Sequence, residues 1–243
     1  MIPRAVITAL GRVHRGFADA WARDLNTSRR KLLGIDRTVT HRYLESHSIR
    51  KLHLGCGRNL LPGWLNSDFF PKSPAVLHLD ARGRFPLQDG QFDFVFSEHM
   101  IEHIAYAKGS SMVNESFRVL KPGGTLRIST PDLAFLLDLR RSDRTPLQEE
   151  YIRWSTHKFM KAAPYADDTF VINNFVRRWG HLFIYDEKTL RATFVAAGFE
   201  NVVRCALNES AHQELRGLEN EKRMPKGFLQ LETMTLEGSK PMR

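Results

Sequence analysis

Short apolar segments that end at a glycine or a polar residue alternate with helical patterns from residue 50 onward, and this alternation constrains the fold most. We expect strands at about 50–56, 64–69, 75–79, 92–97 and 125–129. A helix is expected at 110–120, ended by the breaker Pro122-Gly123-Gly124. Strands separated by crossover segments favour a mainly parallel sheet. The pattern therefore predicts an α/β fold with a doubly wound sheet.

The alternation of strand and helix patterns stops at 131–180, where leucines and aromatic residues recur at helical spacing. We interpret this stretch as a helical insert after the fifth strand, covering the side where an acceptor binds. A helix at 186–197 with Asp186 as its N-cap, a strand at 202–203 and a last strand at 228–236 complete the fold. The expected organisation is a basic helical segment at 1–49 followed by one domain at 50–243.

The net charge of +9 is concentrated in the N-terminal segment. Residues 1–51 hold 11 Lys and Arg against 4 Asp and Glu, and the rest of the chain is nearly neutral. One apolar stripe at helical spacing runs through this segment: Ile2, Val6, Leu10, Val13, Phe17 and Trp21. Two interpretations stay open, a solvated lead-in helix and a surface for anionic lipid or nucleic acid.

Two features concern the location of the protein. No apolar run approaches the ~20 residues of a membrane span, and we find no secretory signal pattern. The two cysteines, Cys56 and Cys205, are far apart and form no C-x-x-C pair. We expect a cytoplasmic protein; its oligomeric state is left open.

A glycine loop, Gly55-Cys56-Gly57, follows the first expected strand. Ligands of doubly wound sheets bind outside the carboxyl ends of the strands, where glycines let the backbone approach them. Asp68 and Asp80 close the next two strands, where carboxylates can bind ribose and adenine. The dinucleotide pattern G-x-G-x-x-G fails because its third glycine is Leu60. A nucleoside cofactor without a pyrophosphate, such as S-adenosylmethionine, is favoured over NAD.

Four motifs in order resemble those of class I S-adenosylmethionine-dependent methyltransferases: 52–57 (LHLGCG), 92–98 (FDFVFSE), 120–126 (LKPGGTL) and 180–186 (GHLFIYD). The resemblance implies a seven-stranded Rossmann-like sheet whose last strand is antiparallel. It places Gly55 and Gly57 against the methionine part of the cofactor, Asp68 on the ribose and Asp80 near the adenine. Leu54, Cys56, Ser97 and Glu98, which flank these positions, complete the expected cofactor site.

The chain departs from this family in the connection between the first two expected strands. Only ten residues separate Gly57 from Asp68, so the helix that usually lies between these strands must be reduced to a turn. The same short loop resembles a subgroup of sugar and polysaccharide-pathway methyltransferases. That resemblance implies O-methylation of a sugar, a glycan or another small-molecule hydroxyl. An RNA methyltransferase using the basic N-terminal arm and a non-catalytic cofactor-binding module are the alternatives, although the nearly neutral body argues against nucleic acid.

The base that would activate an acceptor hydroxyl is expected among His99, His103 and His181, with Asp132 as a further candidate. His157 in the insert is also placed plausibly, and Asp132 equally fits a helix cap. Residues 99–103 match the zinc-protease pattern H-x-x-E-H. We do not favour that interpretation and expect no metal, with magnesium-assisted transfer through Glu102 and His103 as the minor alternative.

Overall fold

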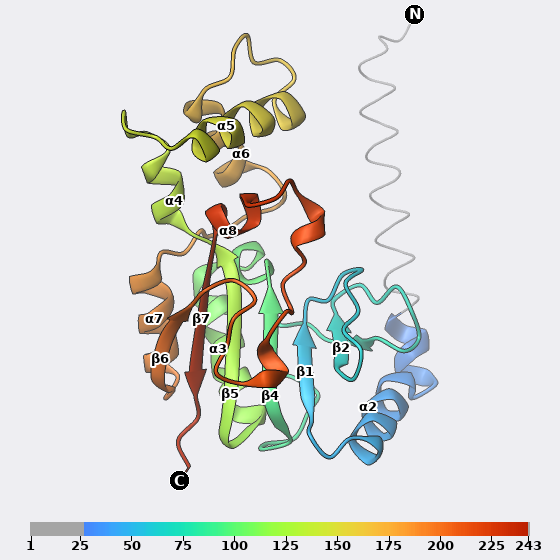
Figure 1. Ribbon diagram of the computed structural model, residues 1–243. Helices are drawn as coiled ribbons and strands as arrows, with labels where there is room; N and C mark the ends of the chain where they lie inside the picture. The colour runs from blue at the N-terminus through green and yellow to red at the C-terminus, as the bar shows by residue number, and fades with distance from the viewer. Residues whose placement is uncertain (1–26, 243) are drawn as a thin grey trace, which may run out of the picture.

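A seven-stranded sheet forms the centre of the molecule in this computed structural model, which describes residues 27–242. The strand order is β3-β2-β1-β4-β5-β7-β6 (Figure 1). Neighbouring strands are parallel except for β7, which is antiparallel to both β5 and β6. The prediction of a Rossmann-like, mostly parallel sheet with an antiparallel last strand is confirmed.

The strands are short at one edge and long at the centre. Their bounds are β1 Lys51–Leu54, β2 Leu65–Asp68, β3 Leu77–His78, β4 Phe92–Glu98, β5 Leu120–Pro131, β6 Glu200–Cys205 and β7 Thr233–Ser239. The main helices are α2 Ile35–Ser46, α3 Tyr106–Val119, α4 Leu133–Asp138, α5 Pro146–Phe159, α6 Asp168–Arg177, α7 Glu187–Ala196 and α8 Phe228–Glu232.

Each face of the sheet has its own apolar cluster, because side chains alternate along a strand. Leu52 of β1 and Val95 of β4 belong to the large core, which also contains Met112 of α3 and Leu190 of α7. Phe96, one residue beyond Val95, packs in a small separate cluster. That cluster contains Trp64 and Leu215, so the loop segment between β6 and α8 helps to cover the second face.

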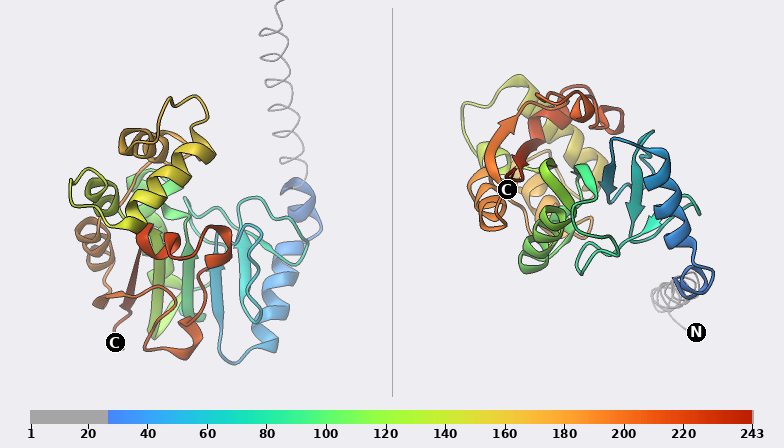
Figure 2. Two further views of the ribbon diagram at one scale, coloured as in Figure 1. Left: turned by 45° about the horizontal axis from the view of Figure 1, so that its top comes forward. Right: turned by 90° about the horizontal axis from the view of Figure 1, so that it is seen from below.

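The stretch after β5 is helical, as predicted, and α4, α5 and α6 form a unit beyond the carboxyl end of β5 and next to α8 (Figures 1 and 2). A hydrophobic cluster of its own holds α4, α5 and α6 together and includes Phe135, Tyr151 and Phe175. Phe228 of α8 joins this cluster. The insert is thereby packed against the chain segment that leads into β7.

The predicted last strand at 228–236 is wrong in its first half. Residues 228–232 form α8, and the strand begins only at Thr233. Gly227, at φ 83°, starts the helix, and Phe228, Leu229 and Glu232 are buried by it. The alternation of Leu229, Leu231 and Met234 suggested a strand. The segment forms a helix instead, and Phe228 is buried against the insert.

Asp186 is the N-cap of α7 as predicted, because its side chain accepts a hydrogen bond from Thr189 N. The short connection from β1 to β2 contains no helix, in agreement with its length. The apolar stripe from Ile2 to Trp21 lies outside the described residues, so its interpretation stays a prediction. Among residues 27–242, no helix is long and apolar enough to cross a membrane.

Candidate active site

Two adjoining cavities lie at the carboxyl ends of the strands and share His99 and His103. The first, of about 520 Å³, is called here the glycine-loop cleft; its lining includes Gly55, Asp68, Phe69, Asp80, Arg82 and Met100. The second, of about 260 Å³, is called the aromatic pocket; its lining includes Glu102, Tyr151, Trp154, Phe159, Phe175, Trp179, His181 and Glu232. The predicted site thus divides into two compartments with a common wall.

The two glycines of the loop differ in what surrounds them. Both have positive φ, 67° at Gly55 and 53° at Gly57, a region that favours glycine. A Cβ at Gly55 would overlap the side chain of Met100, whereas a Cβ at Gly57 would meet nothing within 4 Å. The backbone at Gly57 is therefore not covered by other atoms, although Gly57 lies outside the lining of the cleft, and its contact with the methionine part of S-adenosylmethionine stays a prediction.

Asp68 closes the loop onto the second strand. Its Oδ2 accepts a hydrogen bond from Gly57 N at 2.8 Å, and its Oδ1 accepts one from Phe70 N at 2.6 Å. Carboxylate oxygens have further lone pairs, so Asp68 can still accept from ribose hydroxyls. These two bonds orient the carboxylate at the wall of the cleft, the position expected for it.

Asp80 also lines the cleft, but its carboxylate is held by Arg82. Both oxygens of Asp80 accept from the guanidinium at 2.8 Å, and these hydrogen bonds lower the pKa of Asp80. The same guanidinium lies 4.6 Å from the centre of the Phe69 ring. Phe69 and Arg82 were not predicted from the sequence, although an aromatic residue directly after Asp68, the aspartate expected to bind the ribose, is a detectable signal.

Five of the expected cofactor residues do not line the cleft: Leu54, Cys56, Gly57, Ser97 and Glu98. Leu54, Cys56 and Ser97 are buried in the sheet and its loop. Glu98 accepts a hydrogen bond from Asn220 N at 3.0 Å, and burial raises the pKa of its carboxyl group. These residues support the loop or the strand end, and a direct contact with cofactor stays a prediction for them.

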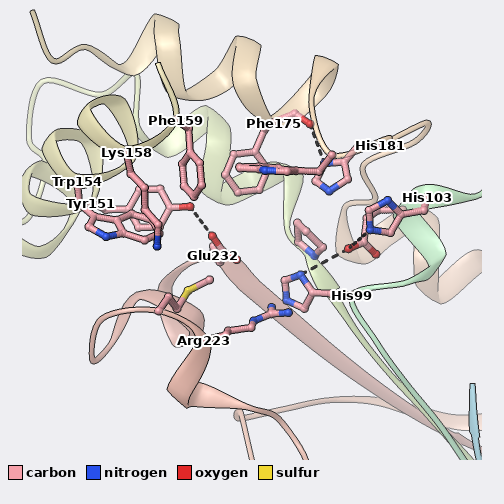
Figure 3. A pocket seen from close by; sticks show the side chains of 14 residues that line it. His99, His103, Tyr151, Trp154, Lys158, Phe159, Phe175, His181, Arg223 and Glu232 are labelled. Carbon is pink, nitrogen blue, oxygen red and sulfur yellow. Dashed lines mark hydrogen bonds and ion pairs between the residues drawn. The ribbon is translucent and has the colours of Figure 1, made fainter. Parts of the chain in front are cut away.

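The insert supplies the phenylalanine, tyrosine and tryptophan side chains of the aromatic pocket (Figure 3). Helix α5 contributes Tyr151, Trp154 and Phe159, and α6 contributes Phe175. The capping box of α5, formed by Thr145 and Gln148, fixes where this helix begins. Arg223, in the loop before α8, also lines the pocket, and no local sequence pattern predicts this.

His181 is held in one tautomer by the backbone. Its Nδ1 lies 2.7 Å from the carbonyl oxygen of Phe175, which can only accept, so Nδ1 carries the hydrogen (Figure 3). Burial lowers the pKa of His181 below its usual value, and the ring is neutral at pH 7. Its Nε2 therefore has a free lone pair for an acceptor proton or a cation.

His103 has a similar arrangement. Its ring hydrogen-bonds to the backbone of Gly180 and Trp179, which partly offsets the lowering of its pKa by burial. Its Nε2 lies 3.9 Å from Glu102 Oε1, and its ring centre is 4.9 Å from that of His181. Two predicted catalytic residues, 78 positions apart in the chain, are brought together here.

Glu102 and His99 are buried beside this pair. The Glu102 side chain is fully buried, and this desolvation raises the pKa of its carboxyl to about 8. His99 Nδ1 lies 3.5 Å from Glu102 Oε1, and its Nε2 is 2.9 Å from Thr233 Oγ1. Burial lowers the pKa of His99 well below its usual value, so this imidazole is neutral as well.

Two other candidates lie elsewhere. Asp132 caps α4 by accepting from Ala134 N, and its second oxygen accepts from Arg204 at 2.9 Å. It lines neither cavity, so the structure shows the cap role that its position also allowed. His157 is exposed on α5 and is likewise absent from both linings.

Glu232 provides a test of the electrostatics of the aromatic pocket. Burial raises the pKa of this carboxyl to about 7, and Tyr151 donates a hydrogen bond to it. The folded-state pKa is above the usual 4.5, so wild-type protein loses stability as pH rises from about 4.5 through 7. Glu232→Gln removes this loss. At about 1.4 kcal/mol per pKa unit, we expect the variant to gain about 3 kcal/mol over wild type.

The measurement is denaturant unfolding of both proteins at pH 5 and pH 8.5. At pH 5 the two free energies of unfolding are expected to agree closely, since Glu232 is protonated there. At pH 8.5 the variant is expected to be the more stable one. Equal differences at the two pH values would contradict the raised pKa.

Comparisons with known proteins concern the fold and the class of enzyme. Residues 65–128, from β2 into β5, match the model of a family described as "Methyltransferase domain". No curated protein matches the sequence.

Solved structures of methyltransferases are similar at low identity. Phosphoethanolamine N-methyltransferase 2 of Haemonchus contortus is 14% identical with a TM-score of 0.46, over 79% of this chain and 49% of that one. The chain spans about half the length of that enzyme. A Thermotoga maritima methyltransferase, described as a possible histamine N-methyltransferase, is 18% identical with a TM-score of 0.45, over 89% and 96% of the two chains.

The sequence match covers the segment that contains Asp68, Asp80, His99 and His103, and the sheet has the expected strand order. The match supports the predicted methyltransferase class, and the strand order confirms the predicted fold. The chain therefore contains a stretch that matches a methyltransferase domain, within a sheet that has the strand order expected of the class I fold.

Proposed function

We propose that the protein transfers the methyl group of S-adenosylmethionine to a hydroxyl group of a small-molecule or glycan acceptor bound in the aromatic pocket. The observation that carries this proposal is the wall shared by the two cavities. His99 and His103 line both the glycine-loop cleft and the aromatic pocket. A nucleophile above these residues would face a methyl donor held by Gly57 and Asp68.

The cofactor supplies an activated methyl group on a sulfonium sulfur. The protein must align the acceptor oxygen with that group and promote the loss of its proton. His103 and His181 are suited to the second task, since both are neutral; His181 is partly buried, and His103 is exposed. The Nε2 of His181, left free by the bond to Phe175, is available on the pocket side.

The walls of the pocket support a ring-shaped acceptor with hydroxyl groups. Trp154, Phe159 and Trp179 present aromatic rings, and adjacent rings in this set lie about 5 Å apart. Such surfaces can pack on the apolar face of a sugar, while Glu102 and Glu232 add polar groups at the base of the pocket. A place in a polysaccharide pathway is part of this proposal.

The replacement His181→Asn tests the role of this side chain. Asparagine can still donate to the Phe175 carbonyl but has no atom in place of Nε2. We expect methyl transfer to fall by about 10²- to 10⁴-fold with an unchanged affinity for S-adenosylmethionine. The rate is measured by transfer of a radiolabelled methyl group to a panel of glycans, lipids and RNA.

The panel also tests the acceptor class. Labelling of a glycan or small-molecule hydroxyl that His181→Asn reduces would support the proposal. Labelling confined to RNA, or an amine acceptor as the preferred substrate, would contradict it. A matched control is His157→Asn, since this exposed histidine lines neither cavity and its loss is expected to leave the rate unchanged.

A further inference from the structure

Three side chains in the shared wall bring potential metal ligands together. One ligand atom each from Glu102, His103 and His181 lies within 4.8 Å of the other two. Glu102 and His103 come from the short turn after β4, whereas His181 comes from the end of the insert. Because the fold joins them from segments far apart in sequence, their convergence is not a consequence of local helix geometry.

An oxygen of Glu102 has no hydrogen-bond partner among the described residues. Oε2 accepts from Thr130 Oγ1 at 3.0 Å, but Oε1 is buried and unpartnered. The whole side chain has no exposed surface. A buried carboxylate oxygen without a donor or cation is costly. Since Oε1 is the atom that faces His99 and His103, a positive ion in this space would satisfy it.

The two histidines have the outer contacts that metal ligands usually have. His181 donates a hydrogen bond from Nδ1 to the Phe175 carbonyl, and the His103 ring is hydrogen-bonded to the backbone of Trp179 and Gly180. Metal-bound histidines commonly donate their second N–H to such a carbonyl, which fixes the ring and its tautomer. Both rings are thus oriented before an ion arrives.

We propose that Glu102, His103 and His181 bind one divalent first-row transition-metal ion in the wall between the two cavities. Two imidazole nitrogens and one carboxylate oxygen suit zinc, manganese, iron or cobalt better than magnesium, which prefers oxygen ligands. Three protein ligands leave coordination positions open for an acceptor oxygen. With the ion bound, His103 and His181 would be its ligands and not proton acceptors. A hydroxyl bound to the ion would then lose its proton to water more readily than a free one, so the ion would replace the histidines in that task.

This arrangement differs from the H-x-x-E-H interpretation of the sequence. Residues 101–103 form a single 3-10 turn, so His99 and His103 do not share the face of an α-helix. His99 Nε2 is instead engaged with Thr233 Oγ1, and the second imidazole of the proposed site is that of His181. The expectation of no metal is replaced here by a site that only the fold assembles.

Binding is tested on the full chain after removal of metals with a chelator. Titration with Co²⁺ is followed by visible absorption, and titration with Zn²⁺ by calorimetry. We expect one ion per chain in the site, and at least about a 10-fold loss of affinity in Glu102→Gln and in His181→Ala. The matched control His157→Ala, on an exposed histidine of α5, is expected to bind as wild type does.

Two results would overturn the proposed site. One is wild-type protein that takes up neither ion, and the other is Glu102→Gln with unchanged Co²⁺ binding and spectrum. Calorimetry with S-adenosylmethionine on each variant shows whether it is still folded around its cofactor, so a misfolded variant is recognised.

The consequence for catalysis rests on the proposed function, whereas the binding experiment does not. Methyl transfer is expected to fall at least 10-fold in metal-free protein and to return when the ion is added. Transfer that is equal with and without a proven bound ion would overturn the acceptor-binding role of the ion. Metal uptake without transfer to any hydroxyl acceptor would instead contradict the proposed function.

Discussion

Replacement of Gly57 by alanine is expected to weaken binding of S-adenosylmethionine by about 10- to 100-fold. The new methyl group would occupy the open space beside the loop backbone, where nothing lies within 4 Å. Overpacking of this kind costs about 1–3 kcal/mol, and each 1.4 kcal/mol is a factor of ten in affinity. Calorimetric titration with the cofactor and with S-adenosylhomocysteine measures the effect directly.

Gly90→Ala is the matched control for this variant. Gly90 has a similar positive φ of 63°, and its Cβ would likewise meet nothing within 4 Å. It precedes β4, at the end of the sheet opposite to the cleft. Both variants are expected to lose about 1–2 kcal/mol of stability from backbone strain, but only Gly57→Ala is expected to lose affinity. Equal affinity in the two would show that the cofactor does not approach Gly57.

Gly55 is unsuited to the same experiment, although the sequence alone suggested it as an equivalent position. A Cβ at Gly55 would overlap Met100 and so displace a side chain of the cleft wall. A substitution there changes packing and binding together. The difference between the two glycines is visible only once the chain after β4 has been placed against the loop.

Replacement of Arg127 by leucine is expected to destabilise the protein by about 3–5 kcal/mol. Arg127 has no exposed surface, and its guanidinium lies 2.7 Å from Glu219 and 2.5 Å from Glu237. The substitution leaves two buried carboxylates without their cation. It also releases the loop between β6 and α8, since Arg127 donates to the Glu209 carbonyl as well. Urea unfolding at neutral pH measures the loss.

The exposed pair of Arg141 and Asp143 provides the control, and Arg141→Leu is expected to have no measurable effect on stability. A triple variant, Arg127→Leu with Glu219→Gln and Glu237→Gln, is expected to recover part of the lost stability because no unpaired charge remains. If Arg127→Leu unfolds at the same urea concentration as wild type, the buried network does not contribute as described.

The sheet could be predicted because its signals are local. The glycine loop and the two aspartates each lie within a few residues of the end of a strand. The predicted breaker at 122–124 was wrong in one respect: α3 ends at Val119, and residues 122–124 are already part of β5, which begins at Leu120. The misassigned segment 228–232 shows the limit of this reasoning. The spacing of its leucines fits a strand as well as a helix. The segment is helical where Phe228 packs on Tyr151, about 80 residues away in the sequence.

The site was predicted in part for the same reason. Gly57, Asp68 and the histidines after β4 lie next to strands whose ends meet at one edge of the sheet. The aromatic pocket could not be assembled from sequence, because its walls come from α5, α6 and the loop before α8. The pairing of His181 with Glu102 depends on how the insert folds back, which no short pattern encodes.

The shared wall has a thermodynamic consequence. His99 and His103 belong to one short segment after β4 and contact whatever fills either cavity. A cofactor that shifts this segment changes the free energy of binding of the acceptor, and linkage requires the acceptor to change the affinity for the cofactor by the same factor. Substrate analogues should therefore be identifiable without turnover, by the change that they cause in cofactor affinity.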